Sequence, residues 1–176
     1  HLNKTRLIKE YFSRVRKIWK SQLTARNTVI AHNTFAIPVL VPTFGILEWT
    51  KEEVDQIDVK TRKILTLNQS FHRNSNVARL YTTRDQGGRG LNSATETFIS
   101  RIVAVAEHLR LASTTSTLLR EVHMHEKEKL LRLASNFCVT LNIVPQLAVD
   151  QRDLARAAHS ALKMENARAW TELSQH

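Results

Sequence analysis

Residues 79–91 read RLYTTRDQGGRGL and form the most informative stretch of this 176-residue chain. The chain has four glycines, and three of them, Gly87, Gly88 and Gly90, lie within this stretch. Glycine adopts positive φ without steric cost and lets another segment of backbone approach closely. Arg84 and Arg89 flank the glycines with rigid guanidinium donors that suit phosphate oxygens. The stretch predicts either a loop that contacts an anion or a nucleic acid, or a plain tight turn between two helices.

Helical patterns extend on both sides of this loop. Glycine and proline are scarce, and leucine, alanine and charged helix formers are common, which favours an all-α protein. Apolar residues recur at spacings of three and four from Lys4 to Ser21, and Pro38 ends or kinks a second helix. We therefore expect a multi-helix bundle with the glycine-rich basic loop between helices. Residues 1–92 form the bundle that ends in the loop, and residues 93–176 form a helical extension packed on it.

Two capping boxes predict where further helices begin. Thr50 is followed three residues later by Glu53, and Ser93 by Glu96, a spacing that lets side chains satisfy the first backbone N–H groups of a helix. The other expected elements are a short turn over Val77–Tyr81, one long helix from Leu118 to Phe137, and a last helix capped by Asp150.

The chain is strongly basic, with a formal net charge of +10. Residues 1–26 contain eight lysines and arginines against Glu10 alone, and the segment around the glycine loop is also basic. The acidic residues gather between Glu48 and Asp58. This balance favours an acidic partner, most often nucleic acid.

Catalytic and metal-binding patterns are poor. The chain has no phosphate-binding Walker loop, no Gly-x-Ser-x-Gly and no paired-aspartate turn of the polymerase type. His123 and His125 point to different faces of a helix, unlike the spacing of zinc-binding histidines. We expect no catalytic residue, no metal and no cofactor, and the chain by itself is not expected to be an enzyme.

Three other polar or reactive residues have ordinary explanations. Asp55 and Asp58 share one face of a predicted helix, where a solvated acidic face, or salt bridges to Lys51 and Arg62, is favoured over a cation site. Cys138 is the one cysteine, which excludes an internal disulfide and favours a buried, inert thiol.

No apolar run approaches the about 18 residues that cross a membrane, so no membrane partner is expected. The chain begins within a helical pattern, which is typical of a fragment of a longer protein. The expected location is intracellular, in the nucleus or the cytoplasm or both.

Five segments of the chain carry a recognisable pattern: YFSRVRKI (11–18), IAHNTFAIPVL (30–40), FGILEWTKEE (44–53), TRKIL (61–65) and the loop itself. In order and spacing they resemble the region after the polymerase palm in non-LTR retrotransposon reverse transcriptases. They are similar to that family's GI-x-W-T, D-x-x-T-R-K and RLY-x-x-R-x-x-GGRGL patterns. The resemblance covers roughly residues 10–92, does not include the catalytic palm, and becomes diffuse after Ser93.

The resemblance implies a thumb and the linker that follows it. A thumb is a helical bundle that closes over the primer–template duplex, so the implied partners are that duplex or an RNA–DNA hybrid and the rest of the polymerase chain. The residues expected to contact nucleic acid are Arg14, Lys17, Lys20, Arg26, Arg84 and Arg89. The aromatic residues Tyr11, Phe35, Trp49 and Trp170 fall on apolar stripes and are expected in the core. The alternative is a domesticated helical domain that binds protein through the same basic face.

Overall fold

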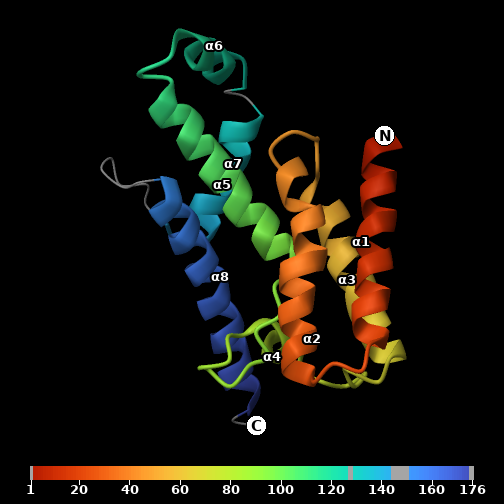
Figure 1. The fold of residues 1–176 in the computed structure, drawn as a ribbon. Helices are drawn as coiled ribbons and strands as arrows, with labels where there is room; N and C mark the ends of the chain where they lie inside the picture. Colours follow the sequence, from red (N-terminus) through yellow and green to blue (C-terminus); the bar gives the residue numbers. More distant parts are fainter. Residues whose placement is uncertain (1, 127–128, 144–150, 175–176) are drawn as a thin grey trace. The chain divides into compact units, whose positions relative to one another are not determined.

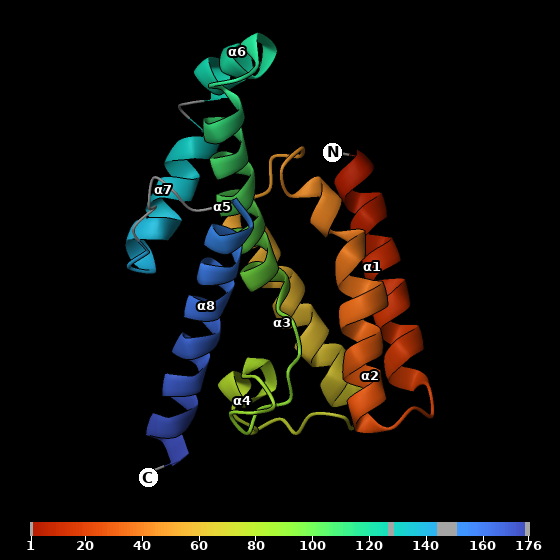
Figure 2. The ribbon, with the colours of Figure 1, turned by 60° about the vertical axis from the view of Figure 1, so that its left-hand side comes forward.

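The computed structural model describes residues 2–126, 129–143 and 151–174, and within these ranges it is all-helical (Figures 1 and 2). Eight α-helices and three short π or 3-10 segments are present there, with no strand, which confirms the predicted fold class. The chain divides into two compact units, residues 1–95 with 163–176, and residues 96–162. The sequence-based division after residue 92 lies close to this boundary, but residues 163–176 belong to the first unit.

Three helices of the first unit lie side by side in both views (Figures 1 and 2). They are α1 (Leu2–Lys20), α2 (Ala25–Ala31) and α3 (Lys51–Leu67), and α1 packs on both others. Their facing side chains are apolar and almost completely buried, among them Tyr11, Val15, Val54 and Leu65. The Tyr11 hydroxyl, buried with them, lies 3.1 Å from Thr61 Oγ1. Burial of apolar side chains is the main favourable term in holding such a bundle together.

Helix α2 ends at Ala31, seven residues before Pro38, the residue at which the sequence predicted its end or a kink. It continues into a π-helical turn, η1 (His32–Ala36), and then into two 3-10 turns, η2 (Ile37–Val39) and η3 (Val41–Thr43). Proline has no backbone N–H and clashes with the preceding turn, so a regular α-helix cannot resume through Pro38 or Pro42.

The expected burial of four aromatic residues holds for only two of them. Tyr11 and Trp49 are buried, but Phe35 is 60% exposed and Trp170 is partly exposed. Phe35 lies in η1, where the wider π turn holds more residues than an α turn. That extra residue rotates Phe35 away from the stripe that the 3.6-residue period predicts.

The first predicted capping box is confirmed at the start of α3. Thr50 Oγ1 accepts a hydrogen bond from the Glu53 backbone N–H, and Glu53 Oε2 accepts one from the Thr50 N–H. Lys4 Nζ lies 2.7 Å from the Glu53 carboxylate and also donates to the Glu48 carbonyl. The hydrogen bond from Lys4 is the main reason why the pKa of Glu53 is lowered.

Asp58 is not part of a solvated acidic face, because it is buried, with only 6% of its surface exposed. Its carboxylate accepts hydrogen bonds from Ser93 Oγ at 2.5 Å, the Ala94 N–H at 2.8 Å and the Thr95 N–H at 3.0 Å. The first N–H groups of a helix have no partner within that helix, and Ala94 begins α5 (Ala94–Ala112). Asp58 therefore joins α3 to the start of α5.

The two basic residues predicted to pair with this face, Lys51 and Arg62, have different partners. Asp55 pairs with Lys51 at 3.0 Å, as expected. Arg62 instead donates from Nη1 to the Tyr81 hydroxyl at 3.0 Å.

Replacing Asp58 with asparagine should lower the free energy of unfolding by about 2–3 kcal/mol, because buried N–H donors at the start of α5 lose a charged acceptor. Chemical unfolding measures the loss. Asp55→Asn is the comparison: its carboxylate is 41% exposed and ion-paired with Lys51, and the hydrogen bond it accepts from Thr95 Oγ1 at 2.7 Å can be kept by the asparagine oxygen, so it should cost less than about 1 kcal/mol. Equal losses in the two variants would contradict the role assigned to Asp58.

His32 is fully buried beside two aromatic rings, Tyr11 and Trp19. Trp19 Nε1 donates to His32 Nδ1 at 3.2 Å. Burial lowers the pKa of His32 to about 4, because the charged imidazolium loses its hydration there. His32 is therefore neutral in the folded protein at ordinary pH.

This burial predicts a pH dependence of stability. An unfolded histidine takes up a proton near pH 6.5, and folded His32 does so only near pH 4, so the unfolded state binds more protons in between. Stability should fall by roughly 3 kcal/mol as the pH decreases through this window. His32→Asn keeps an acceptor for Trp19 but does not titrate, so its unfolding free energy should change less over the same pH range. Parallel pH profiles for the two proteins would count against this assignment.

The second unit contains most of α5, then α6 (Thr117–Glu126), α7 (Leu130–Thr140) and the first part of α8 (Gln151–Ser174). The rings of Phe98 and Phe137 meet edge to face at 6.0 Å. Cys138 is buried as predicted, and burial raises the pKa of its thiol.

Two expectations for this unit need correction or lie outside the described residues. The single long helix predicted from Leu118 to Phe137 is divided into α6 and α7, and Lys129 lies in a turn between them. Asp150, the predicted cap of α8, is outside the described residues. Over the described part of the chain, every helix is too short or too polar to span a bilayer.

Candidate nucleic-acid interface

The glycine loop folds back on α4 (Val77–Tyr81) through a set of backbone hydrogen bonds. The Arg89 N–H donates to the Arg79 carbonyl at 2.9 Å, Gly90 to Thr82 at 2.8 Å, and Leu91 to Leu80 at 3.1 Å. The two ends of the loop are thus paired over several residues. The arginines between them are carried by a closed turn.

Each glycine of the loop is required for a physical reason that the structure shows. Gly87 and Gly90 have φ of 80° and 73°, in the left-handed region that residues with a Cβ rarely adopt. A Cβ on Gly88 would lie 2.1 Å from the Thr82 carbonyl oxygen, closer than any side chain permits. The loop can take this shape only because these positions have no side chain.

Two side chains from distant parts of the chain hold the loop in place. Lys163 on α8 is 6% exposed, and its Nζ donates to the carbonyls of Tyr81 at 2.7 Å and Leu91 at 3.1 Å. Asn33 donates to the Gly90 carbonyl and accepts from the Asn92 N–H, both at 2.9 Å. These bonds satisfy loop carbonyls that would otherwise be buried without partners.

Three of the predicted contact residues line one pocket, which we call the arginine pocket. Arg26 lies in the first turn of α2, whereas Arg84 and Arg89 belong to the glycine loop, and the cavity volume is about 460 Å³. All three arginines are exposed, and none of the residues that line the pocket is acidic. Clustered guanidinium groups without a neighbouring carboxylate attract anions, and phosphate above all.

The other three predicted residues lie outside this pocket. Arg14 is ion-paired with Glu10 at 2.7 Å and donates to the Phe35 carbonyl at 3.0 Å. Lys17 and Lys20 are exposed in the last turn of α1. Arg14 is therefore partly occupied by contacts within the protein, whereas the two lysines add positive charge on the surface.

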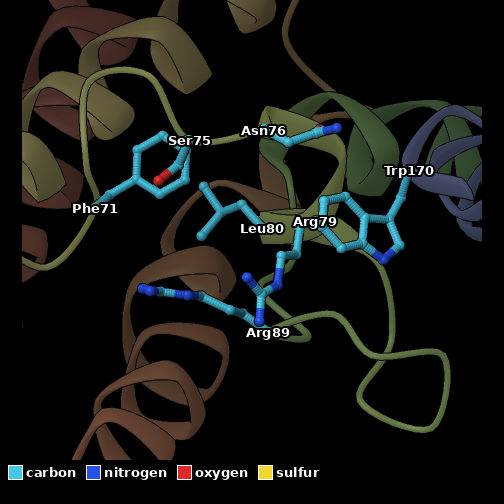
Figure 3. A pocket seen from close by; sticks show the side chains of 7 residues that line it. All are labelled: Phe71, Ser75, Asn76, Arg79, Leu80, Arg89 and Trp170. Atoms are coloured by element: carbon cyan, nitrogen blue, oxygen red, sulfur yellow. The ribbon is translucent and has the colours of Figure 1, made fainter. Parts of the chain in front are cut away.

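A second pocket, which we call the tryptophan pocket, combines two arginines with an aromatic ring (Figure 3). It is lined by Arg79, Arg89 and Trp170, and its cavity volume is about 220 Å³. The Arg79 guanidinium carbon lies 5.2 Å from the centroid of a Trp170 ring, within the range of a cation–π contact. Buried Phe71 and Leu80 form the apolar part of its lining.

The sequence did not identify Arg79 or Trp170 as binding residues. Arg79 lies in the conspicuous loop segment, so its basic side chain was a usable signal. Trp170 had no local signal, because it is far along the chain and only the packing of α8 brings it to the loop.

Arg89 lines both pockets and also has a structural contact. Its Nη1 donates to the Ser70 carbonyl at 2.5 Å, two residues after Asn68, the C-cap of α3. A guanidinium has five N–H donors, so one hydrogen bond to the protein leaves others for a ligand.

Among the side chains that the structure describes, no three histidine, cysteine, aspartate or glutamate residues gather as a metal site. Comparison of the chain with protein-family models, with curated proteins and with solved structures finds no match. The interpretation of the interface therefore depends on its geometry and charge.

Alanine substitutions in the loop should separate the effect of a steric clash from the effect of a strained backbone dihedral. Gly88→Ala forces a Cβ against the backbone of Thr82, so the backbone must move, and we expect a loss of about 3 kcal/mol. Gly87→Ala adds a Cβ whose nearest neighbour, Trp170 Nε1, is 3.9 Å away, so only its positive φ is strained, at about 1–2 kcal/mol. Thermal or chemical unfolding gives the order, and a larger loss for Gly87→Ala would contradict the described loop.

Arg89→Ala should have both a structural and a binding effect. Loss of the bond to Ser70 should lower the unfolding free energy by about 0.5–1.5 kcal/mol, and loss of the charge should weaken nucleic-acid binding. Arg84→Ala is the matched variant from the same loop, expected to stay within about 0.5 kcal/mol in stability while also weakening binding. An Arg89→Ala protein that is destabilised yet binds normally would make Arg89 purely structural.

Proposed function

We propose that this chain is a nucleic-acid-binding helical module of a non-LTR retrotransposon reverse transcriptase. It holds the backbone of a primer–template duplex or RNA–DNA hybrid, and carries no catalysis itself. The catalytic step belongs to the rest of the polymerase chain, which is the second partner in this proposal.

The observation that carries the proposal is the arginine pocket. Arg26 and the pair Arg84 and Arg89 come from segments far apart in the sequence, yet they line one concave surface with no acidic lining residue. Phosphate contacts of this kind fix the position and orientation of a duplex without reading its bases. A thumb needs that property, because it must hold every template sequence equally.

The wider charge distribution supports the same function. The net charge is +10, and Lys17 and Lys20 are exposed at the end of α1. Sequence-independent binding to nucleic acid depends mainly on such cations, which release counterions from the phosphate backbone.

The affinity for duplex should fall steeply with salt. With about three phosphates contacted by the arginine pocket, the slope of log K against log salt should be about −3, since each contact contributes roughly −0.9. Fluorescence anisotropy with two unrelated duplex sequences measures both the slope and the lack of sequence preference. Each of Arg26→Ala and Arg84→Ala should reduce the slope by about one.

The control is Arg168→Ala, an exposed arginine on α8 that lines neither the arginine pocket nor the tryptophan pocket. It removes the same charge and should leave the slope nearly unchanged. An affinity that is insensitive to salt, or absent at low salt, would rule out the proposed function for this chain.

The second candidate is a domesticated protein-binding domain, and one observation favours it. Ile30 and Phe35, on α2 and η1, are 49% and 60% exposed, which is unusual for large apolar side chains so close in sequence. If the chain is a nucleic-acid module, Phe35→Ala should leave the duplex affinity unchanged. If it is a protein-binding domain, the unmodified chain should show no salt-dependent binding to duplex.

A further inference from the structure

The tryptophan pocket has a composition that simple phosphate binding does not require. Two arginines, Arg79 and Arg89, share it with a partly exposed indole, Trp170, and none of its lining residues is acidic. In the view of Figure 3 the Arg79 side chain lies beside Trp170, whereas the Arg89 side chain extends away from Trp170, below Phe71. Flat and cationic groups together suit a ligand that is both planar and anionic.

The size of the pocket limits what it holds. At about 220 Å³ it is smaller than the roughly 300–1,000 Å³ of pockets that enclose a whole drug-sized ligand. It therefore fits one planar group of a longer molecule. The indole of Trp170 and the guanidinium plane of Arg79 are both surfaces on which a nucleobase stacks.

The two pockets share one lining residue. Arg89 lines the tryptophan pocket and also the arginine pocket, where Arg26 and Arg84 are placed to hold phosphates. A strand whose backbone crosses the arginine pocket therefore passes close to the tryptophan pocket. This adjacency favours an extended polyanion over a phosphorylated tyrosine side chain, which needs one pocket alone.

We propose that the tryptophan pocket holds one unpaired base of the bound nucleic acid. A paired base is already stacked within the helix, so only a nucleotide beyond the end of the duplex can enter. The chain would then recognise a junction between paired and unpaired nucleic acid. This inference rests on the proposed function, since it assigns a base site next to the backbone site.

The test compares three duplexes with the unmodified chain. One is blunt, one has a short single-stranded overhang, and the third has the same overhang built from abasic nucleotides, with both overhang polarities examined. Because the last two have equal numbers of phosphates, their difference in Kd reports the base alone. For the better polarity we expect the base-containing overhang to bind at least about fivefold more tightly than the abasic one.

Tryptophan fluorescence gives an independent readout. Trp19 and Trp49 are only 6% and 5% exposed, and Trp19 also lines the arginine pocket, so the difference in quenching between the base-containing and the abasic overhang reports Trp170. The base-containing overhang should quench the emission more strongly than the abasic overhang. Trp170→Phe should abolish this difference but retain part of the gain in affinity, because phenylalanine keeps a ring for stacking.

Trp170→Ala should remove the gain from the overhang and leave the affinity for blunt duplex unchanged. Arg168→Ala, on the same helix, should preserve the ratio between the two overhangs. Equal affinity for base-containing and abasic overhangs would overturn the inference, as would an equal loss of blunt and overhang binding in Trp170→Ala.

Two further outcomes separate this inference from the proposed function. If none of the three duplexes binds at low salt, the proposed function itself fails. If all three bind with the same affinity, only the base site fails. Quenching of Trp170 by a phosphotyrosine peptide, with no quenching by any overhang, would instead assign the pocket to a protein ligand.

Discussion

At Gly88 the chain passes so close to Thr82 that a Cβ would lie 2.1 Å from its carbonyl oxygen. The loop around this contact, and the position of its arginines, depend on that approach. The same Thr82 carbonyl accepts the Gly90 N–H at 2.8 Å, and the Gly88 N–H donates to Thr83 at the same distance. With a side chain at Gly88 these bonds could not form together, and Arg84 and Arg89 would no longer be fixed on one closed turn.

The closed loop is connected to the rest of its unit by polar side chains that are themselves buried. Lys163 donates to two loop carbonyls, and Asp58 accepts from three groups at the start of α5. A buried ammonium or carboxylate is costly unless it is fully hydrogen-bonded, and these two are bonded to backbone groups that need partners. Together they link α3, α5, α8 and the loop in a way that apolar packing, which has no direction, does not specify.

Local signals in the sequence predicted the parts of this structure that depend on neighbouring residues. The Thr50–Glu53 capping box appears as expected, and the glycines lie in a tight turn that requires them. Asp58 was misread because its partners lie 35 to 37 residues away. Phe35 was misread because a π turn changed the helical period, and Trp170 because the packing of α8 is a long-range property. The arginine pocket was likewise predictable as a set of residue types, but its membership, with Arg26 and without Arg14, depended on tertiary structure.

Three acidic residues of the first unit are engaged away from the arginine pocket, and Asp85, which follows Arg84 in the loop, does not line it. Glu53 is bonded to Lys4, Asp55 to Lys51, and Asp58 to the start of α5, so these carboxylates are occupied away from the loop. Arg89 is different, because its bond to Ser70 restrains the side chain without neutralising its charge. A restrained side chain loses less conformational entropy when it contacts a ligand, which strengthens binding at equal charge. A loop fixed by glycines and an arginine fixed by a carbonyl are thus two forms of the same preorganisation, and both would be lost if the loop opened.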